Sequence, residues 1–190
     1  SHLLFSFLFS LLTIRNWNLN TFAKSPAGSS IHHIYSSTFP SPMSLFFKSP
    51  LDIDIRLKGE DQREHVDVKT SKGRREKYPL YLDGETVKGS VTIRPRDGKK
   101  LEHTGIKVQF IGSIEMNNDR GQHDDFLSLG QELAAPAELR HPETFDFEFK
   151  NVEKQFESYN GVNVRLRYYI RVTVFRRMGD VVRDKDVWVY

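Results

Sequence analysis

The sequence predicts an all-β fold, an antiparallel β-sandwich of the immunoglobulin-like kind with one short helix. Two observations support this prediction. Apolar and polar residues alternate with period two along five segments, which is typical of strands that bury one face. Turn residues such as Asp83-Gly84, Asp97-Gly98 and Asn160-Gly161 separate the segments. Sheets with one apolar face must cover each other, so two packed antiparallel layers follow.

The five clear strands and two weaker ones are predicted from the chain in order. In the first, Ile53 and Ile55 alternate with Asp52 and Asp54, so one face is apolar and the other charged. The same alternation continues through the others. The clear strands are predicted over residues 51–57, 87–93, 106–116, 145–149 and 164–174, and the weaker ones over residues 78–82 and 181–189.

A single helix is predicted over residues 126–135. Phe126, Leu129 and Leu133 recur at helical spacing, and Pro136 would end the helix. Ten residues form a marginal helix in isolation, so we expect it to pack on the sandwich.

Residues 1–42 differ from the rest of the chain and are predicted to be disordered or extraneous, with the sandwich domain over residues 43–190. The apolar run at residues 3–12 is typical of a signal peptide, and the following Ser-rich, acid-free stretch resembles a transit sequence. The alternative interpretation is that residues 1–42 are foreign to the working protein, because the sequence from Met43 onward resembles the natural start of a protein. We also expect the protein to continue beyond Tyr190, because residues 186–190 resemble an interrupted strand.

The charge balance argues against a nucleic-acid partner. The chain of 190 residues has a formal net charge of +3, and residues 1–42 contribute Arg15 and Lys24 with no acidic residue. The remaining domain is therefore close to neutral and has no broad field for a polyanion. The chain has no cysteine, which excludes disulfides and thiolate metal sites.

The sequence contains no recognisable catalytic constellation, so we predict a binding protein without enzymatic activity, cofactor or metal. No glycine-rich phosphate loop or nucleophile elbow occurs. Asp119, Asp124 and Asp125 make the densest acidic loop, which we interpret as solvated rather than as a calcium site. Glu102 and His103 could be written as an acid–base pair, but neighbours in a strand point to opposite faces.

A basic stripe of Arg165, Arg167 and Arg171 lies on the polar face of one predicted strand. One interpretation is a docking face for anionic lipid or an acidic partner. The alternative, which we favour, is a solvated face whose arginines pair across strands with residues such as Asp146 and Glu148.

Three stretches carry a resemblance to a known family. Residues 83–91, Asp-Gly-Glu-Thr-Val-Lys-Gly-Ser-Val, resemble a loop-and-strand signature of arrestin-like proteins. Residues 101–115 and 159–169 resemble the arrestin-like subunit of the retromer complex, the vacuolar protein sorting twenty-six family. The resemblance runs from about Met43 to Tyr190.

The resemblance implies an arrestin-like β-sandwich that is the N-terminal half of a bilobed protein. It also implies a non-catalytic scaffold of the retromer coat in endosome-to-Golgi and recycling transport of receptors. The implied partners are an α-solenoid retromer subunit, bound mainly through the second lobe, and sorting nexins, with cargo receptor tails bound indirectly. The protein would be cytoplasmic and recruited to endosomal membrane peripherally through its partners. An acidic loop at Asp83, Gly84 and Glu85 would border a sorting-nexin docking edge.

Two other functions remain alternatives. An arrestin-domain adaptor that binds receptor tails or ubiquitin ligases would carry Pro-Pro-x-Tyr motifs, and none occurs in these 190 residues. A secreted sugar-binding sandwich would require residues 3–12 to act as a true signal peptide.

Overall fold

The computed structural model describes residues 49–69, 73–96, 98, 100–116 and 123–190. The predicted boundary at residues 42 and 43 and the predicted disorder before it lie outside these residues. The one helix in the described part is a 3-10 turn at Glu60–Gln62. None of the described helical residues forms a segment long and apolar enough to cross a membrane. The strands are β1 (Leu51–Leu57), β2 (His65–Lys69), β3 (Arg75–Tyr81), β4 (Val87–Pro95), β5 (Leu101–His103), β6 (Gly105–Met116), β7 (His123–Ala134), β8 (Ala137–Leu139), β9 (Glu143–Phe149), β10 (Tyr159–Asn160), β11 (Val164–Phe175) and β12 (Val181–Val189).

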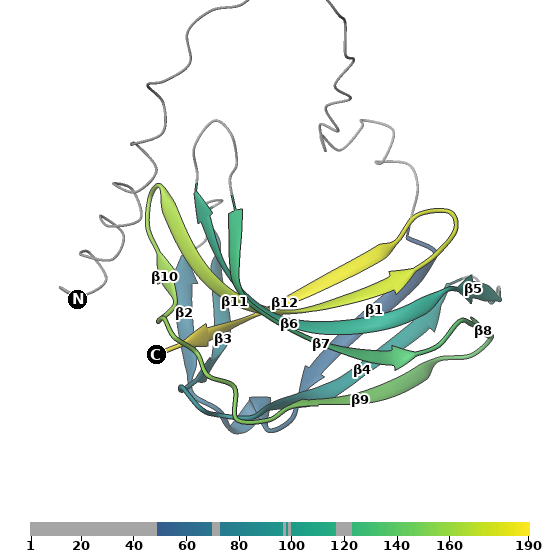
Figure 1. Cartoon of the computed structure of the whole chain (residues 1–190), viewed down its shortest axis with the longest axis horizontal. Coiled ribbons are helices and arrows are strands. Elements are labelled where there is room, and N and C mark those ends of the chain that lie inside the picture. The colour runs from purple at the N-terminus through teal and green to yellow at the C-terminus, as the bar shows by residue number, and fades with distance from the viewer. Residues whose placement is uncertain (1–48, 70–72, 97, 99, 117–122) are drawn as a thin grey trace, which may run out of the picture. The chain divides into compact units, whose positions relative to one another are not determined.

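The strands form two packed layers and a small ribbon (Figure 1). The smaller layer has the order β1-β4-β9, and the larger has the order β2-β3-β12-β11-β6-β7 with β10 added to β11. All pairings are antiparallel except the short parallel contact of β12 with β3. Strands β5 and β8 pair as a separate ribbon at the end of the sandwich where the β11–β12 turn also lies (Figure 1).

The core lies between the two layers. Phe110 of β6 meets Phe149 of β9 with ring centroids 6.3 Å apart, so the contact bridges the sheets. On the same face of the large sheet, Tyr168 of β11 stacks on Phe110 at 5.9 Å. Val91 and Ile93 of β4 are completely buried from the other side. Burial of these apolar faces is the main stabilising term of the fold.

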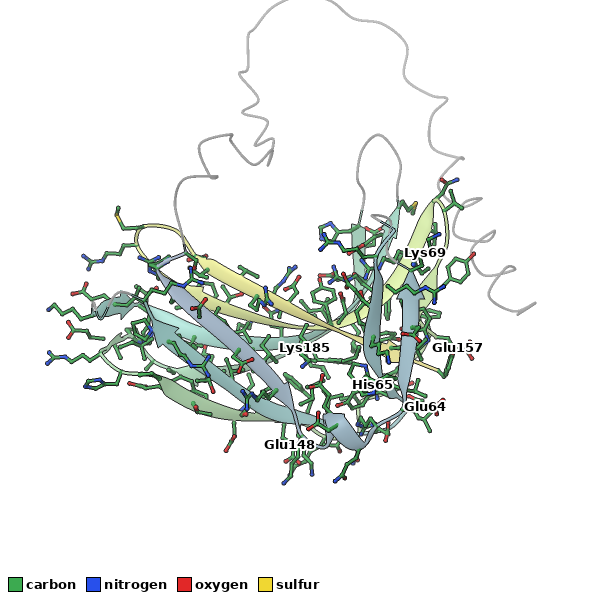
Figure 2. The ribbon with its side chains drawn as sticks, turned by 180° about the vertical axis from the view of Figure 1, so that it is seen from behind. Glu64, His65, Lys69, Glu148, Glu157 and Lys185 are labelled. Carbon is green, nitrogen blue, oxygen red and sulfur yellow. The ribbon has the colours of Figure 1, made fainter. Side chains whose placement is uncertain are left out.

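Polar side chains bridge the two layers along their lateral edges. Near β7 and β9, Gln131 Oε1 accepts a hydrogen bond from the Glu148 amide at 3.3 Å. Near β1 and β12, Lys185 Nζ donates to the Ile55 carbonyl at 3.1 Å and contacts the Glu60 carboxylate at 2.6 Å. Figure 2 shows Lys185 near the middle of the molecule, where β12 approaches β1. Such contacts occupy edge groups that would otherwise remain open to other strands.

The predicted strands and the all-β sandwich are confirmed. The five clear predictions correspond to β1, β4, β6, β9 and β11, and the two weaker ones to β3 and β12. The sequence reading missed β2, β5, β8 and β10, which have five residues or fewer. So few residues show too little alternation to stand out from a loop.

The predicted helix at residues 126–135 is wrong, because residues 126–134 belong to strand β7. The register of β7 against β6 shifts between Gly112 and Ser113, which leaves Phe126 as an extra residue, and shifts again near Leu133. Each bulge inserts one residue and so displaces the apolar positions from period two. The resulting spacing imitates a helix.

An irregular segment, residues 150–158, connects the small layer at β9 to the large layer at β10. Its backbone is anchored to Tyr168, which is fully buried. The Tyr168 hydroxyl donates to the Phe156 carbonyl at 2.8 Å and accepts from the Phe156 amide at 3.3 Å. Val152 of this segment is 2% exposed and belongs to the core.

We expect Gly112→Ala to destabilise the fold. A Cβ at Gly112 would lie 2.5 Å and 2.7 Å from the Phe126 ring and 2.9 Å from the Tyr168 ring. Tyr168 is fully buried and Phe126 is packed against the core, so the free energy of unfolding should fall by about 1–3 kcal/mol in urea denaturation. The matched control is Gly130→Ala, whose Cβ would meet the flexible end of Lys107. An equal loss in the two variants would contradict this account.

Candidate functional site

The predicted partner-binding residues Asp83, Gly84 and Glu85 lie together in the loop between β3 and β4. Gly84 has a φ of 73°, in the left-handed region, and no atom lies within 4 Å of the place its Cβ would take. The Glu85 amide donates to the Leu82 carbonyl at 3.3 Å and closes the turn. The glycine is therefore required by the backbone conformation and not by crowding.

The Glu85 carboxylate points back onto the protein. Its Oε2 accepts from the Leu82 amide at 2.7 Å and from Arg63 Nη1 at 3.1 Å. Arg63 is itself held, because its guanidinium lies 3.9 Å from the Tyr81 ring centroid and donates to the Leu80 carbonyl. Burial alone raises the pKa of Glu85, but the bonds from Leu82 and Arg63 outweigh it and hold the pKa below its ordinary value. Glu85 therefore stabilises the loop as a carboxylate.

Lys154, which is only 4% exposed, anchors the β3–β4 loop to the segment of residues 150–158. Its Nζ donates to the backbone carbonyls of Leu82, Val152 and Glu85 at 2.8, 3.0 and 3.1 Å, which uses all three ammonium protons. Its amide donates to Asp83 Oδ1 at 2.6 Å. Burial lowers the pKa of Lys154, and the Asp83 and Glu85 carboxylates partly offset that shift. Lys154 is thus an internal cation for the acidic turn.

Asp83 is the acidic side chain of this loop that faces solvent. One of its carboxylate oxygens accepts from Lys154, and the adjacent Leu82 is 54% exposed. An exposed apolar side chain beside a carboxylate suits a small protein–protein contact with an apolar and a basic group. The three predicted residues therefore share one turn but differ in role.

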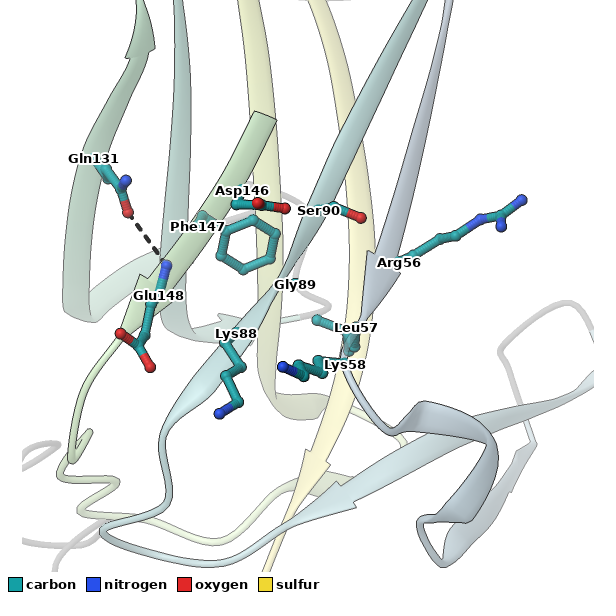
Figure 3. Close-up of a pocket in the computed structure, with 10 residues that line it drawn as sticks. All are labelled: Arg56, Leu57, Lys58, Lys88, Gly89, Ser90, Gln131, Asp146, Phe147 and Glu148. Carbon is teal, nitrogen blue, oxygen red and sulfur yellow. Dashed lines mark hydrogen bonds between the residues drawn. The ribbon is translucent and has the colours of Figure 1, made fainter. Parts of the chain in front are cut away.

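A cavity of about 750 Å³ opens beside strand β4, a few residues beyond this loop (Figure 3). Lys88 and Ser90 of β4 line it together with Asp146 of β9 and Arg56 of β1. The side chains around it therefore carry both charges, with no uniform sign. The Gln131–Glu148 bond crosses one wall and is drawn as the dashed line in Figure 3.

The basic stripe on β11 forms ion pairs with its neighbouring strands. Arg167 contacts Glu115 of β6 at 3.0 Å and Asp186 of β12 at 2.6 Å. Arg171 forms two hydrogen bonds of 2.9 Å to Asp184, which raise the pKa of its guanidinium.

Arg165 belongs to the same network and reaches Glu115 at 3.7 Å and Asp186 at 3.5 Å. The Tyr169 ring lies between Arg167 and Arg171, whose guanidinium carbons are 4.1 and 5.0 Å from its centroid. The predicted cross-strand pairing is present, but the partners Asp146 and Glu148 are wrong. Those two residues lie on β9 in the other layer.

Glu102 and His103 point to opposite faces of β5, as predicted, because Glu102 is exposed and His103 is 4% exposed. Asp119 of the acidic loop lies outside the described residues. Within the described ranges, no three His, Asp or Glu side chains gather in a way that could hold a metal ion.

Comparison with known proteins agrees with this architecture. A sequence profile of vacuolar protein sorting-associated protein 26, Vps26, matches residues 47–190. The Schizosaccharomyces pombe protein of that name is 53% identical over 148 residues, which cover 78% of this chain and 50% of that protein. The chain belongs to the Vps26 family. The resemblance drawn from the three sequence stretches is confirmed.

Vertebrate Vps26 relatives match to a similar extent. Vacuolar protein sorting-associated protein 26B of Homo sapiens is 47% identical over 150 residues, covering 78% of this chain and 45% of that protein. The chain therefore spans about half the length of the curated relatives that it matches. Among solved structures, the sporulation control protein Spo0M of Bacillus subtilis aligns with a TM-score of 0.51 at 13% identity. It covers 75% of this chain and 50% of Spo0M, and it shows likeness of fold alone.

Sequence reasoning missed the residues that hold the acidic loop in place. Lys154 lies in the irregular segment, where no period predicts which side chain is buried. Arg63 lies between the 3-10 turn and β2, and neither of these two elements was predicted. The one available indication was the composition of the turn, because two carboxylates favour cations nearby. The chain has several basic residues, however, and the sequence does not show which of them lies beside the turn.

We expect Lys154→Met to loosen the loop. The ammonium stabilises three carbonyls, so its removal should lower the free energy of unfolding by about 1–3 kcal/mol. Hydrogen exchange should also quicken at the Gly84 amide, which donates to the Val152 carbonyl at 3.0 Å. Lys150→Met is the control, because the Lys150 side chain is 74% exposed. Unchanged stability and exchange would show that the loop does not depend on Lys154.

A second prediction concerns acid stability. The pKa of Glu85 in the fold lies below its ordinary value of 4.5, so folding favours the ionised form. Its contribution is complete above that value and is lost as the pH falls through the folded pKa. Glu85→Gln should therefore reduce the loss of unfolding free energy between neutral and acid pH. The control Glu153→Gln, at an exposed residue, should leave the slope unchanged. A steeper slope in Glu85→Gln would refute the assignment.

Proposed function

We propose that this chain forms part of a non-catalytic scaffold subunit of the retromer coat, acting in endosome-to-Golgi and recycling transport of receptors. The observation that carries the proposal is the Vps26 match over residues 47–190. The relatives with this match carry the name vacuolar protein sorting-associated protein 26. A sandwich that presents loops and strand edges suits binding rather than chemistry.

The β3–β4 loop is the contact that we assign to a sorting nexin. Asp83 offers an exposed carboxylate, and the half-exposed Leu82 lies beside it. Lys154 and Arg63 hold the turn in a single geometry, so little conformational entropy is lost when a partner docks. A partner segment with one basic and one apolar side chain matches this surface.

The other partners follow from family membership. The α-solenoid subunit of the coat would bind mainly through the half of the family length that lies outside this chain. Cargo receptor tails would be held indirectly through the assembled coat. The protein would then work on the cytoplasmic side of endosomal membranes, to which its partners recruit it.

A pull-down from cytosol tests the coat role. The chain, extended through the remaining half of the family length, is used as bait and the captured proteins are identified by mass spectrometry. Recovery of a large α-solenoid protein with sorting nexins is the expected result. Recovery of receptors or ubiquitin ligases without the solenoid would overturn the proposal in favour of an arrestin-domain adaptor.

The same bait tests the loop. Asp83→Asn keeps an oxygen that can accept from the Lys154 amide, so the substitution removes the charge and preserves the turn. Sorting-nexin capture should fall roughly two- to fivefold, as expected for one exposed charge pair, with solenoid capture unchanged. Asp67→Asn, at an exposed residue of β2, is the matched control. Undiminished sorting-nexin capture by Asp83→Asn would place that contact elsewhere.

A further inference from the structure

A second cavity, of about 650 Å³, is lined by the β5–β8 ribbon and the β11–β12 turn. Figure 1 shows these elements at the end of the sandwich opposite the β3–β4 loop. The β5–β8 ribbon forms one wall, and the turn between β11 and β12 forms the other. The Thr104 amide donates to the Phe175 carbonyl at 2.8 Å, which ties the two walls together. His103 and Arg176, the neighbours of these two residues in sequence, both line the cavity.

Two polar side-chain atoms at this cavity lack partners. His103 is 4% exposed, yet its Nδ1 has no hydrogen-bond partner among the described residues. The Nε of Arg176 is also buried without a partner in that part of the chain. Buried polar atoms in native proteins are nearly always satisfied, by protein or by something bound. Two such atoms in one cavity indicate a polar ligand with hydrogen-bond acceptors.

The cavity also has uncommitted positive charge. Its carboxylates are Glu102, which is exposed, and Glu138, which is bound by Lys100 at 3.1 Å and by Arg140 at 2.7 Å. Within the described residues, neither the Arg176 nor the Arg177 guanidinium forms an ion pair, in contrast to the three paired arginines of β11.

Two free guanidiniums beside an imidazole suit an oxyanion, because arginine binds phosphate oxygens with two parallel hydrogen bonds.

The tip of the β11–β12 turn adds an apolar contact. Met178 follows the two arginines and is 90% exposed, and Gly179, with a φ of 106°, turns the chain back into β12. An exposed apolar side chain directly beside basic residues is the arrangement by which peripheral proteins touch an anionic membrane surface. This feature favours a phosphate carried by a lipid over a phosphate free in solution.

We propose that this cavity binds the phosphate group of an anionic membrane lipid of the phosphoinositide class. Arg176 and Arg177 hold the phosphate oxygens, His103 donates from Nδ1, and Met178 enters the interface between headgroups and acyl chains. The sandwich thereby has a membrane contact of its own. This contact is distinct from the partner-mediated recruitment described above and does not depend on it.

The test measures partition of the 190-residue chain into phosphatidylcholine vesicles, with and without a phosphatidylinositol phosphate. Any binding by other apolar segments is present in both vesicle types, so the readout is the increment caused by the phosphorylated lipid. That increment should fall by about tenfold in the double variant Arg176→Gln, Arg177→Gln. Arg75→Gln is the control and should change the increment less than about twofold, because Arg75 is an exposed residue of β3, a strand that lies away from the β5–β8 ribbon (Figure 1).

A soluble probe separates the phosphate site from the membrane contact. Inositol phosphate should shift the His103 ring resonances in the wild-type chain and not in the double variant. Met178→Ser should weaken vesicle partition and leave the response to inositol phosphate intact. The native fold of each variant is checked by circular dichroism and thermal unfolding.

Three outcomes would overturn the proposal. An unshifted His103 in the presence of inositol phosphate and inorganic phosphate would exclude the phosphate site. An equal loss in Arg75→Gln would show that the lipid response is unspecific attraction. A His103 shift with both soluble anions but no lipid-dependent increment would assign the cavity to free phosphate and reject the lipid.

Discussion

The structure depends on how polar groups of one irregular segment, residues 150–158, are satisfied where it crosses from one layer to the other. A buried backbone without hydrogen bonds is costly, and this segment has no strand ladder over most of its length. Tyr168 supplies a donor and an acceptor to Phe156, and Lys154 supplies three donors to carbonyls. Burial raises the pKa of Tyr168 to about 12, so its hydroxyl stays protonated and can donate at every physiological pH.

The same anchoring shapes the candidate site. Because Lys154 donates to the loop backbone and to its own segment, the acidic turn and the crossing segment form one unit. Glu85 is occupied by Leu82 and Arg63 in that unit, whereas Asp83 retains exposure. Two adjacent acidic residues thus divide into one that builds the surface and one that is available to a partner. A loop held in this way would present the proposed partner with a fixed geometry and would not need to fold on contact.

The sequence predicts this fold well wherever period two persists, and it fails where a bulge changes the period. Strands β1, β4, β6, β9 and β11 were all recognised from alternation, whereas Phe126 and Leu133 in β7 imitated a helix. The turn at Gly84 was recognisable from turn chemistry. The pairing of Arg171 with Asp184 was not, because it depends on which strands become neighbours, and alternation within one strand carries no information about strand order.

The two proposed contacts lie near opposite ends of strand β12, because the β3–β4 loop follows Tyr81, the partner of Val189, and the β11–β12 turn precedes Val181. This strand has 9 residues and therefore spans about 30 Å at roughly 3.3 Å per residue. On the neighbouring strand β11, Arg165, Arg167 and Arg171 are neutralised by carboxylates of β6 and β12, whereas within the described residues Arg176 and Arg177, just beyond β11, form no ion pair. Screening reduces interactions between exposed charges beyond about 8–10 Å, so loss of charge at one end cannot alter the field at the other. The effects of changes at Asp83 and at the β11–β12 turn should therefore add, and any strong coupling between them would have to pass through the packed sheet itself.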